Sequence, residues 1–365
     1  MSDTAAYAAL DDRLLVVSVD GDSVGSAAGS TAGSDNEATA GDDWIATERL
    51  VGLDFESVAA SPDRPARAFV GTVDSGIQRT VDGGDTWERV SDVDDRVTSL
   101  AVSPHDPDVV WAGTEPSAVY RSTDGGDTWE SLPPLTDLAS SSEWSYPPRP
   151  HTHRAHWLEP DARDPDRLYV AVEAGGFVRT EDGGETWIDT PESARFDNHT
   201  LATHPDAPDR VYAATSDGYA QSGDGAETWT SPQDGLDHRY AWGLAVPRSD
   251  PGTVVVSSAS GPRSAHTVST AESYVYRTTD ADSVDRDGDG EGDVEWTLAM
   301  DGLPGPEGTV RSVLTAGSDA TLFALNNRGL YRSDDAGERW HRVALPWTES
   351  YESQTPHGLA VVVRD

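Results

Sequence analysis

The sequence lacks two residue types entirely. It has no cysteine, which excludes disulfide bonds and thiolate chemistry. It also has no lysine, so every basic residue is an arginine. A long apolar run is missing near the start: Met1 to Leu10 has no basic residue, and Leu14 to Val19 is too short for a signal peptide or a membrane span. We therefore expect a cytoplasmic protein.

Positive charge is scarce, with 26 basic residues against 65 acidic ones and a formal net charge of -39. Nucleic-acid binding requires a basic patch, and an anionic membrane would repel this chain, so we expect neither partner. The acidic, lysine-free composition resembles that of proteins from extreme halophiles. Twelve tryptophans and 11 tyrosines nevertheless indicate a packed core rather than a disordered chain.

One phrase recurs along the chain, and its clearest form is RTVDGGDTWERV. Copies begin at Arg79, Arg121, Arg179 and Gln221, with degenerate ones at Arg277 and Arg332. The shared pattern S/T-x-D-x-G-x-T-W predicts a hairpin, in which Asp and Gly make the turn and Trp packs between neighbouring sheets. We interpret the aspartates as structural rather than catalytic, because turn chemistry accounts for them.

Two further strand patterns precede each copy, for example Val97 to Val102 and Val109 to Gly113. Four short strands per unit are typical of a propeller blade. The blades are counted by Trp44, Trp87, Trp129, Trp187, Trp229, Trp296 and Trp340. We therefore predict an all-β fold, a single seven-bladed β-propeller of four-stranded antiparallel blades over residues 1–365.

The first unit lacks an innermost strand, and the C-terminal segment Pro356 to Val363 reads as an unpaired one. We predict that it completes the N-terminal blade, because such closure removes exposed sheet edges. We expect the closed propeller to be a monomer.

Two segments fall outside the repeat. Residues 20–43 are rich in Gly, Ser, Ala and Asp, which predicts a disordered insertion. Residues 282–293 form an acidic insertion, in which Asp285, Asp287 and Asp289 resemble the start of a calcium loop. Trp296 occupies the position of the expected bidentate glutamate, so a solvated acidic loop is the alternative. A divalent metal cofactor stays open.

Aligning the innermost strands by their aliphatic cores produces a ring of polar residues at the channel mouth. Its members are Glu56, Thr98, Arg154, His199, Trp242, Arg311 and His357. The two arginines suit a carboxylate or a phosphate, and the tryptophan offers a flat stacking surface. Were the protein an enzyme, Glu56, His199 and His357 would be the catalytic acid and base candidates. Alternatively, the arginines pair with Glu56 or Asp197 and fill the channel.

Further candidates flank this ring. His153 and His156 precede or enter the fourth blade's inner strand, with His156 aligned to an aliphatic position. Arg239 and Tyr240 enter the sixth blade near the same mouth, so we include both with His153 as ligand-binding candidates. We expect residues 135–150 and 260–266 to cover the mouth.

The repeats resemble the Asp-box, or BNR, motif. Propellers with this motif include sialidases, xyloglucan-cleaving glycosidases, sortilin-type receptors and the photosystem II assembly factor. The resemblance covers nearly the whole chain, although only the turn motif is specific. Arg154 and Arg311 would match two members of the sialidase arginine triad, but the Arg-Ile-Pro signature is absent. His153, His199 and His357 loosely resemble the metal-binding histidines of seven-bladed lyases.

The resemblance implies two functions. The first is a binding or scaffold protein with a channel-mouth Arg/His site for an anionic small molecule, a glycan or a protein partner. The alternative is a glycoside hydrolase or lyase acting on an anionic glycan at the same site.

Overall fold

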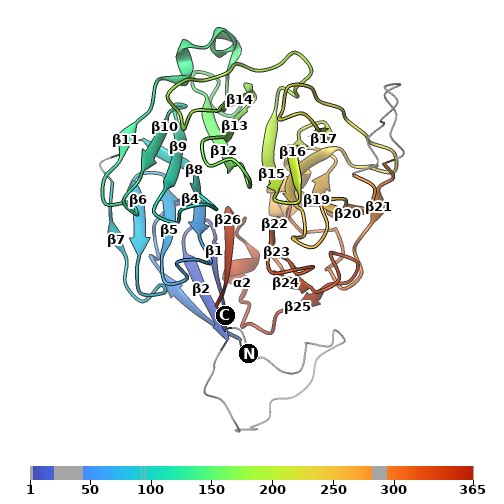
Figure 1. The fold of residues 1–365 in the computed structure, drawn as a ribbon. Helices are drawn as coiled ribbons and strands as arrows, with labels where there is room; N and C mark the ends of the chain where they lie inside the picture. Colours follow the sequence, from blue (N-terminus) through green and yellow to red (C-terminus); the bar gives the residue numbers. More distant parts are fainter. Residues whose placement is uncertain (1–2, 20–43, 92, 94, 282–293, 365) are drawn as a thin grey trace, which may run out of the picture.

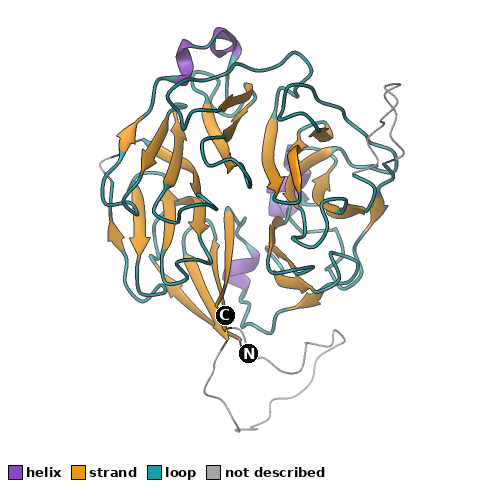
Figure 2. Ribbon diagram, in the orientation of Figure 1, coloured by secondary structure: helices purple, strands orange, loops and turns teal. Residues whose placement is uncertain are grey.

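The computed structural model describes residues 3–19, 44–91, 93, 95–281 and 294–364. Seven antiparallel sheets stand in a ring (Figure 1), and the described short helices lie in the connections (Figure 2). The predicted seven-bladed β-propeller is confirmed. Both predicted insertions, with Asp285, Asp287 and Asp289, lie outside the described residues. No described helix has the length and apolar character needed to cross a membrane.

The first blade is built from both ends of the chain, as predicted. Its strands, from the channel outwards, are β26 (Gly358–Arg364), β1 (Asp3–Ala9), β2 (Leu14–Val19) and β3 (Trp44–Arg49). Strand β26 pairs with β1 in an antiparallel register that sets Leu359 opposite Ala8. The N- and C-terminal strands β1 and β26 therefore lie side by side in one sheet (Figure 1), which removes an open sheet edge there.

The other blades follow the chain in order. The second contains β4 (Phe55–Ala60), β5 (Ala68–Thr72), β6 (Ile77–Thr80) and β7 (Glu88–Arg89), and the third β8 (Arg96–Val102), β9 (Val110–Glu115), β10 (Val119–Ser122) and β11 (Glu130–Ser131). The fourth contains β12 (Arg154–Pro160), β13 (Leu168–Glu173) and β14 (Gly176–Thr180), and the fifth β15 (Asn198–His204), β16 (Ala207–Thr215) and β17 (Gly218–Ser222). The sixth contains β18 (Tyr240–Ala245), β19 (Val254–Ala259), β20 (Ser273–Thr278) and β21 (Thr297–Leu298), and the seventh β22 (Val313–Ala316), β23 (Leu322–Asn326), β24 (Gly329–Ser333) and β25 (His341–Arg342).

The outermost strand is reduced in the fourth and fifth blades. There it shrinks to single bridges, between Arg179 and Ile188 and between Gln221 and Thr230. The helices are η1 (Leu135–Asp137), η2 (Ala139–Glu143), α1 (Pro262–His266), η3 (Val268–Thr270) and α2 (Glu349–Glu352).

The repeated phrase forms the predicted hairpin turn. Asp124 accepts hydrogen bonds from the amide of Thr128 at 2.9 Å and from its hydroxyl at 2.6 Å. These bonds lower the pKa of Asp124 to about 2. Gly126 has φ +89°, and a Cβ there would lie 2.7 Å from the Phe69 ring of the preceding blade, so glycine suits both the turn and the contact. The same pair of bonds recurs at Asp82, Asp182 and Asp224.

The tryptophan of the phrase packs between adjacent sheets, as predicted. Trp229 of the fifth blade meets Phe177 of the fourth edge-to-face, with ring centroids 5.1 Å apart. Trp296 of the sixth blade packs in the same way on Tyr219 of the fifth, at 4.9 Å. The hydrophobic core is therefore a series of layers between blades, which holds the sheets radially around the channel.

Five inner strands carry a β-bulge at their channel-mouth end. The bulged residues are Glu56, Thr98, His156, His199 and Trp242. A bulge leaves one residue unpaired and redirects its side chain, which is why bulges are frequent next to binding sites. Beyond the bulge, each inner strand runs along the channel and pairs with the second strand of its blade. The bulges therefore mark the boundary between the mouth and the body of the channel.

The register corrects the alignment of the fourth blade. Leu158 pairs with Val170 as Leu201 pairs with Ala213, so Leu158 and not His156 holds the aliphatic position. His156 therefore belongs to the ring, and Arg154 lies two residues earlier. The sequence alignment is wrong here because it matched the bulged imidazole to a core position.

Candidate functional site

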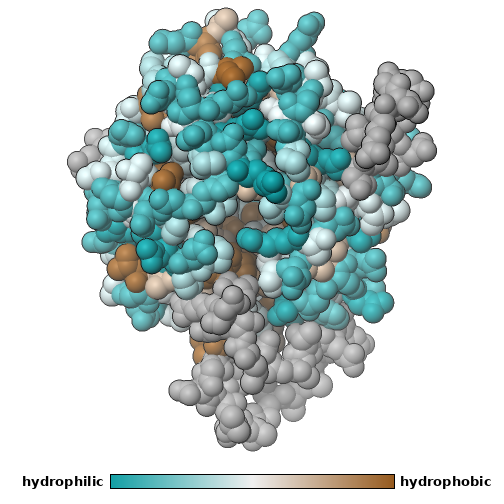
Figure 3. Space-filling view, in the orientation of Figure 1, coloured by the Kyte–Doolittle hydropathy of each residue, from teal (hydrophilic) through white to brown (hydrophobic). Residues whose placement is uncertain are grey.

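A cavity of about 1160 Å³ runs along the inner strands of the propeller. Figure 3 shows the opening as a hollow at the centre of a hydrophilic face, with apolar residues visible in its depth. Small and aliphatic residues of β4, β8, β15, β18 and β26 line the body of the channel, whereas charged and aromatic residues gather where these strands begin. This end of the channel, which we call the mouth, holds most of the ionisable groups that face the cavity.

Buried ion pairs connect the second, third and fourth blades at the mouth. Glu56 contacts Arg96 through one oxygen and Arg154 through the other, the second at 3.5 Å. Arg154 also pairs with Glu173 at the end of β13, and Arg96 approaches Glu115 at the end of β9 within 3.8 Å. Arg154, Glu56 and Glu173 are at most 10% exposed in their side chains. Arg154 is thus neutralised by the protein itself.

Arg311 differs from these arginines. It is 3% exposed, yet no described carboxylate lies within ion-pair distance of it. Its Nη1 donates to the carbonyl of Pro356 at 2.6 Å, its guanidinium stacks 4.8 Å from the Trp242 ring centre, and its Nε has no partner among the described residues. Burial lowers the pKa of Arg311 to about 10, so the group still carries its charge at neutral pH. Among the described residues, the mouth therefore contains a buried cation with no directly paired carboxylate.

Trp242 is the centre of an aromatic wall beside Arg311. The rings of His199 and His266 lie 4.3 Å from it, and that of His156 lies 4.9 Å away. His266 comes from α1, so the 260–266 segment reaches the mouth as expected, and Tyr240 contacts its Nε2 at 3.3 Å. Burial lowers the pKa of His266 to about 2 and that of His156 well below its usual value. Both imidazoles are therefore neutral near pH 7.

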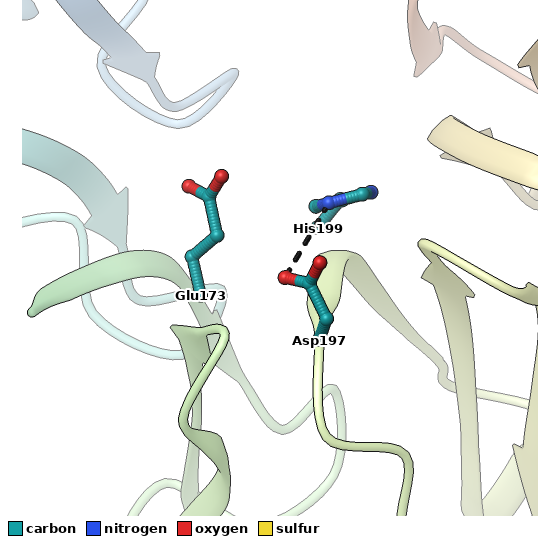
Figure 4. Close-up of side chains that lie close together, drawn as sticks. All are labelled: Glu173, Asp197 and His199. Carbon is teal, nitrogen blue, oxygen red and sulfur yellow. Dashed lines mark ion pairs between the residues drawn. The ribbon is translucent and has the colours of Figure 1, made fainter. Parts of the chain in front are cut away.

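Two carboxylates and an imidazole converge next to this wall. Figure 4 shows Glu173, Asp197 and His199, whose nearest ligand atoms all lie within 4.8 Å of one another. The Nδ1 of fully buried His199 lies 2.7 Å from the carbonyl oxygen of Ala241, and its Nε2 lies 3.6 Å from Asp197 Oδ1. Burial raises the pKa of Asp197, but His199 and the Ala174 amide outweigh it and lower that pKa overall.

The structure brings seven of the predicted site residues to the mouth and leaves two outside. Glu56, Arg154, Tyr240, Trp242, Arg311 and His357 line the cavity, and His199 is buried against Trp242. His357 pairs with Asp11 at 2.8 Å. By contrast, His153 accepts a hydrogen bond from the Ser117 amide and packs on Trp144, and Arg239 is exposed. His153, His199 and His357 therefore do not converge on one point.

Sequence reasoning missed Arg96, Glu115 and Glu173 as site residues. Glu115 and Glu173 each end a strand that is otherwise apolar, in VWAGTE and LYVAVE. A single carboxylate at the end of a fully buried strand was a usable signal, because such a charge requires a buried partner. The partners lie in the neighbouring inner strand of the same blade, Arg96 opposite Glu115 and Arg154 opposite Glu173, and naming them required the strand register.

Comparison with known proteins supports the fold. No family model and no curated protein matches this chain. Among solved structures, it is similar to a GH74 enzyme of Niastella koreensis, at 17% identity and TM-score 0.59, with 79% of this chain and 46% of that chain covered. It is similar to the GH74 xyloglucanase of Xanthomonas campestris, at 17% identity, TM-score 0.57 and coverages of 80% and 45%. It is also similar to YCF48 bound to a D1 peptide, at 16% identity, TM-score 0.55 and coverages of 86% and 94%.

These similarities lie below the identity at which function is shared, so they establish architecture alone. The chain spans less than half of each of the two GH74 enzymes. Fold and cavity together define a seven-bladed β-propeller with a charged, aromatic central site. Propellers of this architecture include glycoside hydrolases and a protein captured with a bound peptide.

Proposed function

We propose that this protein is a binding protein that accepts an anionic group at the channel mouth, against Arg311. The observation that carries the proposal is the buried guanidinium without a described carboxylate partner. A buried charge of this kind destabilises the ligand-free fold unless something pairs with it. A carboxylate or phosphate of a ligand would supply the missing charge and satisfy the Nε donor.

The surroundings of Arg311 fit a ligand with a flat or apolar part beside its anionic group. Trp242 presents a stacking surface next to the guanidinium, and Tyr240 and neutral His266 extend that wall. The ion pairs of Arg154 and Arg96 hold the opposite side of the mouth in place before any ligand arrives. An acidic glycan and an acidic protein segment both offer this chemistry.

The alternative, hydrolysis or elimination on an anionic glycan, has less geometric support. Both oxygens of Glu56 contact guanidinium groups, and His357 pairs with Asp11. A general acid or base must be within hydrogen-bond reach of the substrate proton and free to exchange it. Glu56, held between two arginines, is better suited to fixing the mouth than to proton transfer.

The test is calorimetric titration of the whole chain in multimolar KCl with matched ligand pairs. One pair is trigalacturonate and its methyl ester, and the other is an acidic peptide with a free C-terminus and its amide. We expect the charged member of a pair to bind and Arg311→Met to weaken it by more than about tenfold. Arg248→Met is the control, because Arg248 lines the cavity but is exposed. Equal binding of charged and neutral members would overturn the proposal.

A further inference from the structure

We propose that Glu173, Asp197 and His199, with His156 as the fourth ligand, form a binding site for a first-row divalent metal ion at the channel wall. The four residues come from the fourth and fifth blades: His156 from β12, Glu173 from the end of β13, His199 from β15, and Asp197 from the residue just before that strand. The site adjoins Arg311 across the Trp242 ring, but none of its four ligands is a direct partner of Arg311, and the proposal does not depend on the anionic ligand.

The spacing of the ligand atoms fits a metal better than direct hydrogen bonds. His199 Nε2 lies 3.6 Å from Asp197 Oδ1, and His156 Nδ1 lies 3.6 Å from Glu173 Oε2. Neither separation is short enough for a hydrogen bond. Around a tetrahedral metal with bonds of about 2.1 Å, neighbouring ligand atoms are about 3.4 Å apart. Both gaps are therefore close to the distance that two ligands of one ion adopt.

The tautomer of His199 supports the same reading. A backbone carbonyl only accepts, so the contact with Ala241 requires that Nδ1 carries the hydrogen. The Nε2 atom of the neutral ring then presents a lone pair towards Asp197, in a side chain that is fully buried and has no hydrogen-bond partner for that atom among the described residues. Metal-ligating histidines commonly hold their other N–H in this way, on a backbone carbonyl or carboxylate.

His156 repeats the pattern. Its Nδ1 is buried and has no hydrogen-bond partner among the described residues, although a carboxylate lies beside it. Two imidazole nitrogens without partners, each next to a carboxylate, are the independent signal that raises the cluster above a chance gathering of acidic groups.

The donor set selects the kind of ion. Two nitrogen and two carboxylate ligands suit Zn²⁺, Mn²⁺, Fe²⁺ or Co²⁺, whereas Ca²⁺ and Mg²⁺ prefer oxygen ligands throughout. The two carboxylates would balance the charge of such an ion. Glu173 Oε2, the oxygen beside His156 Nδ1, also pairs with Arg154. Glu56 still balances Arg154.

The first experiment is calorimetric titration of EDTA-treated, full-length protein with Zn²⁺, and separately with Mn²⁺ and Ca²⁺, in multimolar KCl. We expect Zn²⁺ to bind with one-to-one stoichiometry and Ca²⁺ to bind much more weakly. Asp197→Asn keeps the acceptor for the Ala174 amide and removes the charged ligand, so it should weaken Zn²⁺ binding more than about tenfold. Asp11→Asn, in the same mouth but outside the cluster, is the matched control and should bind as the wild type does.

A second readout separates coordination from general electrostatics. Co²⁺ bound by two imidazoles and two carboxylates gives an intense tetrahedral visible absorption band, which His156→Gln should shift or abolish without unfolding the chain. The proposal is overturned if Zn²⁺ binds the wild type no more tightly than about 1 mM, if Asp11→Asn weakens binding as much as Asp197→Asn does, or if the Co²⁺ band is unchanged in His156→Gln.

Discussion

The turns at the outer ends of the blades and the bulges at the channel mouth are both repeated features, but they differ in what repeats. In the turns the side chain recurs: Asp82, Asp124, Asp182 and Asp224 make the same two bonds to a threonine four residues later. In the bulges only the backbone recurs, and its side chain changes from Glu to Thr, His or Trp between blades. Recurrence of a side chain marks a folding element, and variation at one backbone position marks a site.

The two regions also differ in environment. The turn aspartates are mostly solvent-exposed and bind within their own hairpin, so each is independent of the next blade. The mouth residues are buried and bind across blades, as Glu56 does with Arg96 and Arg154. A change in the mouth should therefore cost more free energy than a change in a turn.

The largest expected effect is that of Glu56→Gln. The substitution removes one of the two carboxylates that balance Arg96 and buried Arg154, and loss of a partner from a buried ion pair lowers the free energy of unfolding by about 3 kcal/mol. Denaturant unfolding in multimolar KCl checks this value, because buried pairs are screened little by salt. A loss below about 1 kcal/mol would show that the ion pairs of Glu56 contribute no more to stability than pairs on the surface do.

A pH-dependent effect is expected at Glu159 on the inner strand β12. Burial raises the pKa of Glu159 to about 7, outweighing the bonds that it accepts from Thr203 and Trp157. Between about pH 4.5 and 7 the unfolded chain releases this proton while the folded chain keeps it, so the stability contribution falls as pH rises. The wild type should lose about 1 to 3 kcal/mol across this window relative to Glu159→Gln. Unfolding of both proteins at pH 5 and pH 8 measures the difference, and parallel pH profiles would refute it.

A smaller effect is expected in the turns. Asp224→Ala removes the acceptor of the Thr228 amide and hydroxyl, which should lower the free energy of unfolding by about 1 kcal/mol, as for other lost caps. Binding at the mouth should be unchanged, because Asp224 follows the end of β17 that is remote from the mouth. Thermal unfolding and ligand titration of this variant sharpen the comparison, and lost binding would contradict the separation of the two regions.

The smallest effect is expected for Glu88→Gln on the outer strand β7. Glu88 pairs with Arg79 at 2.8 Å but is 59% exposed, so its loss should change the free energy of unfolding by less than about 0.5 kcal/mol. This variant is the exposed counterpart of Glu56→Gln, and the same denaturant series checks it. Similar losses for the two variants would show that the buried pairs at the mouth stabilise the fold no more than an exposed pair on an outer strand does.

The sequence predicts the part of this molecule that depends on local chemistry. The turn phrase, the blade count and the closure by β26 follow from short-range patterns, and the structure confirms all three. The mouth is predicted less completely because its contacts depend on strand register within a blade and, for Glu56, on residues of two other blades. His156 was aligned to a core position two residues too early, although Leu158 holds that position in the register, and Glu173 was missed because its pairing with Arg154 on the adjacent strand depends on that register.

The central claim is that Arg311 is kept buried for a ligand rather than for the fold, and melting temperatures test it most directly. Wild type and Arg311→Met are compared in multimolar KCl, each with and without the charged ligand that binds best. The account predicts that ligand-free Arg311→Met melts at the same temperature as the wild type or higher, and that the ligand raises only the wild-type melting temperature. A variant that melts several degrees lower and still responds to the ligand would contradict it.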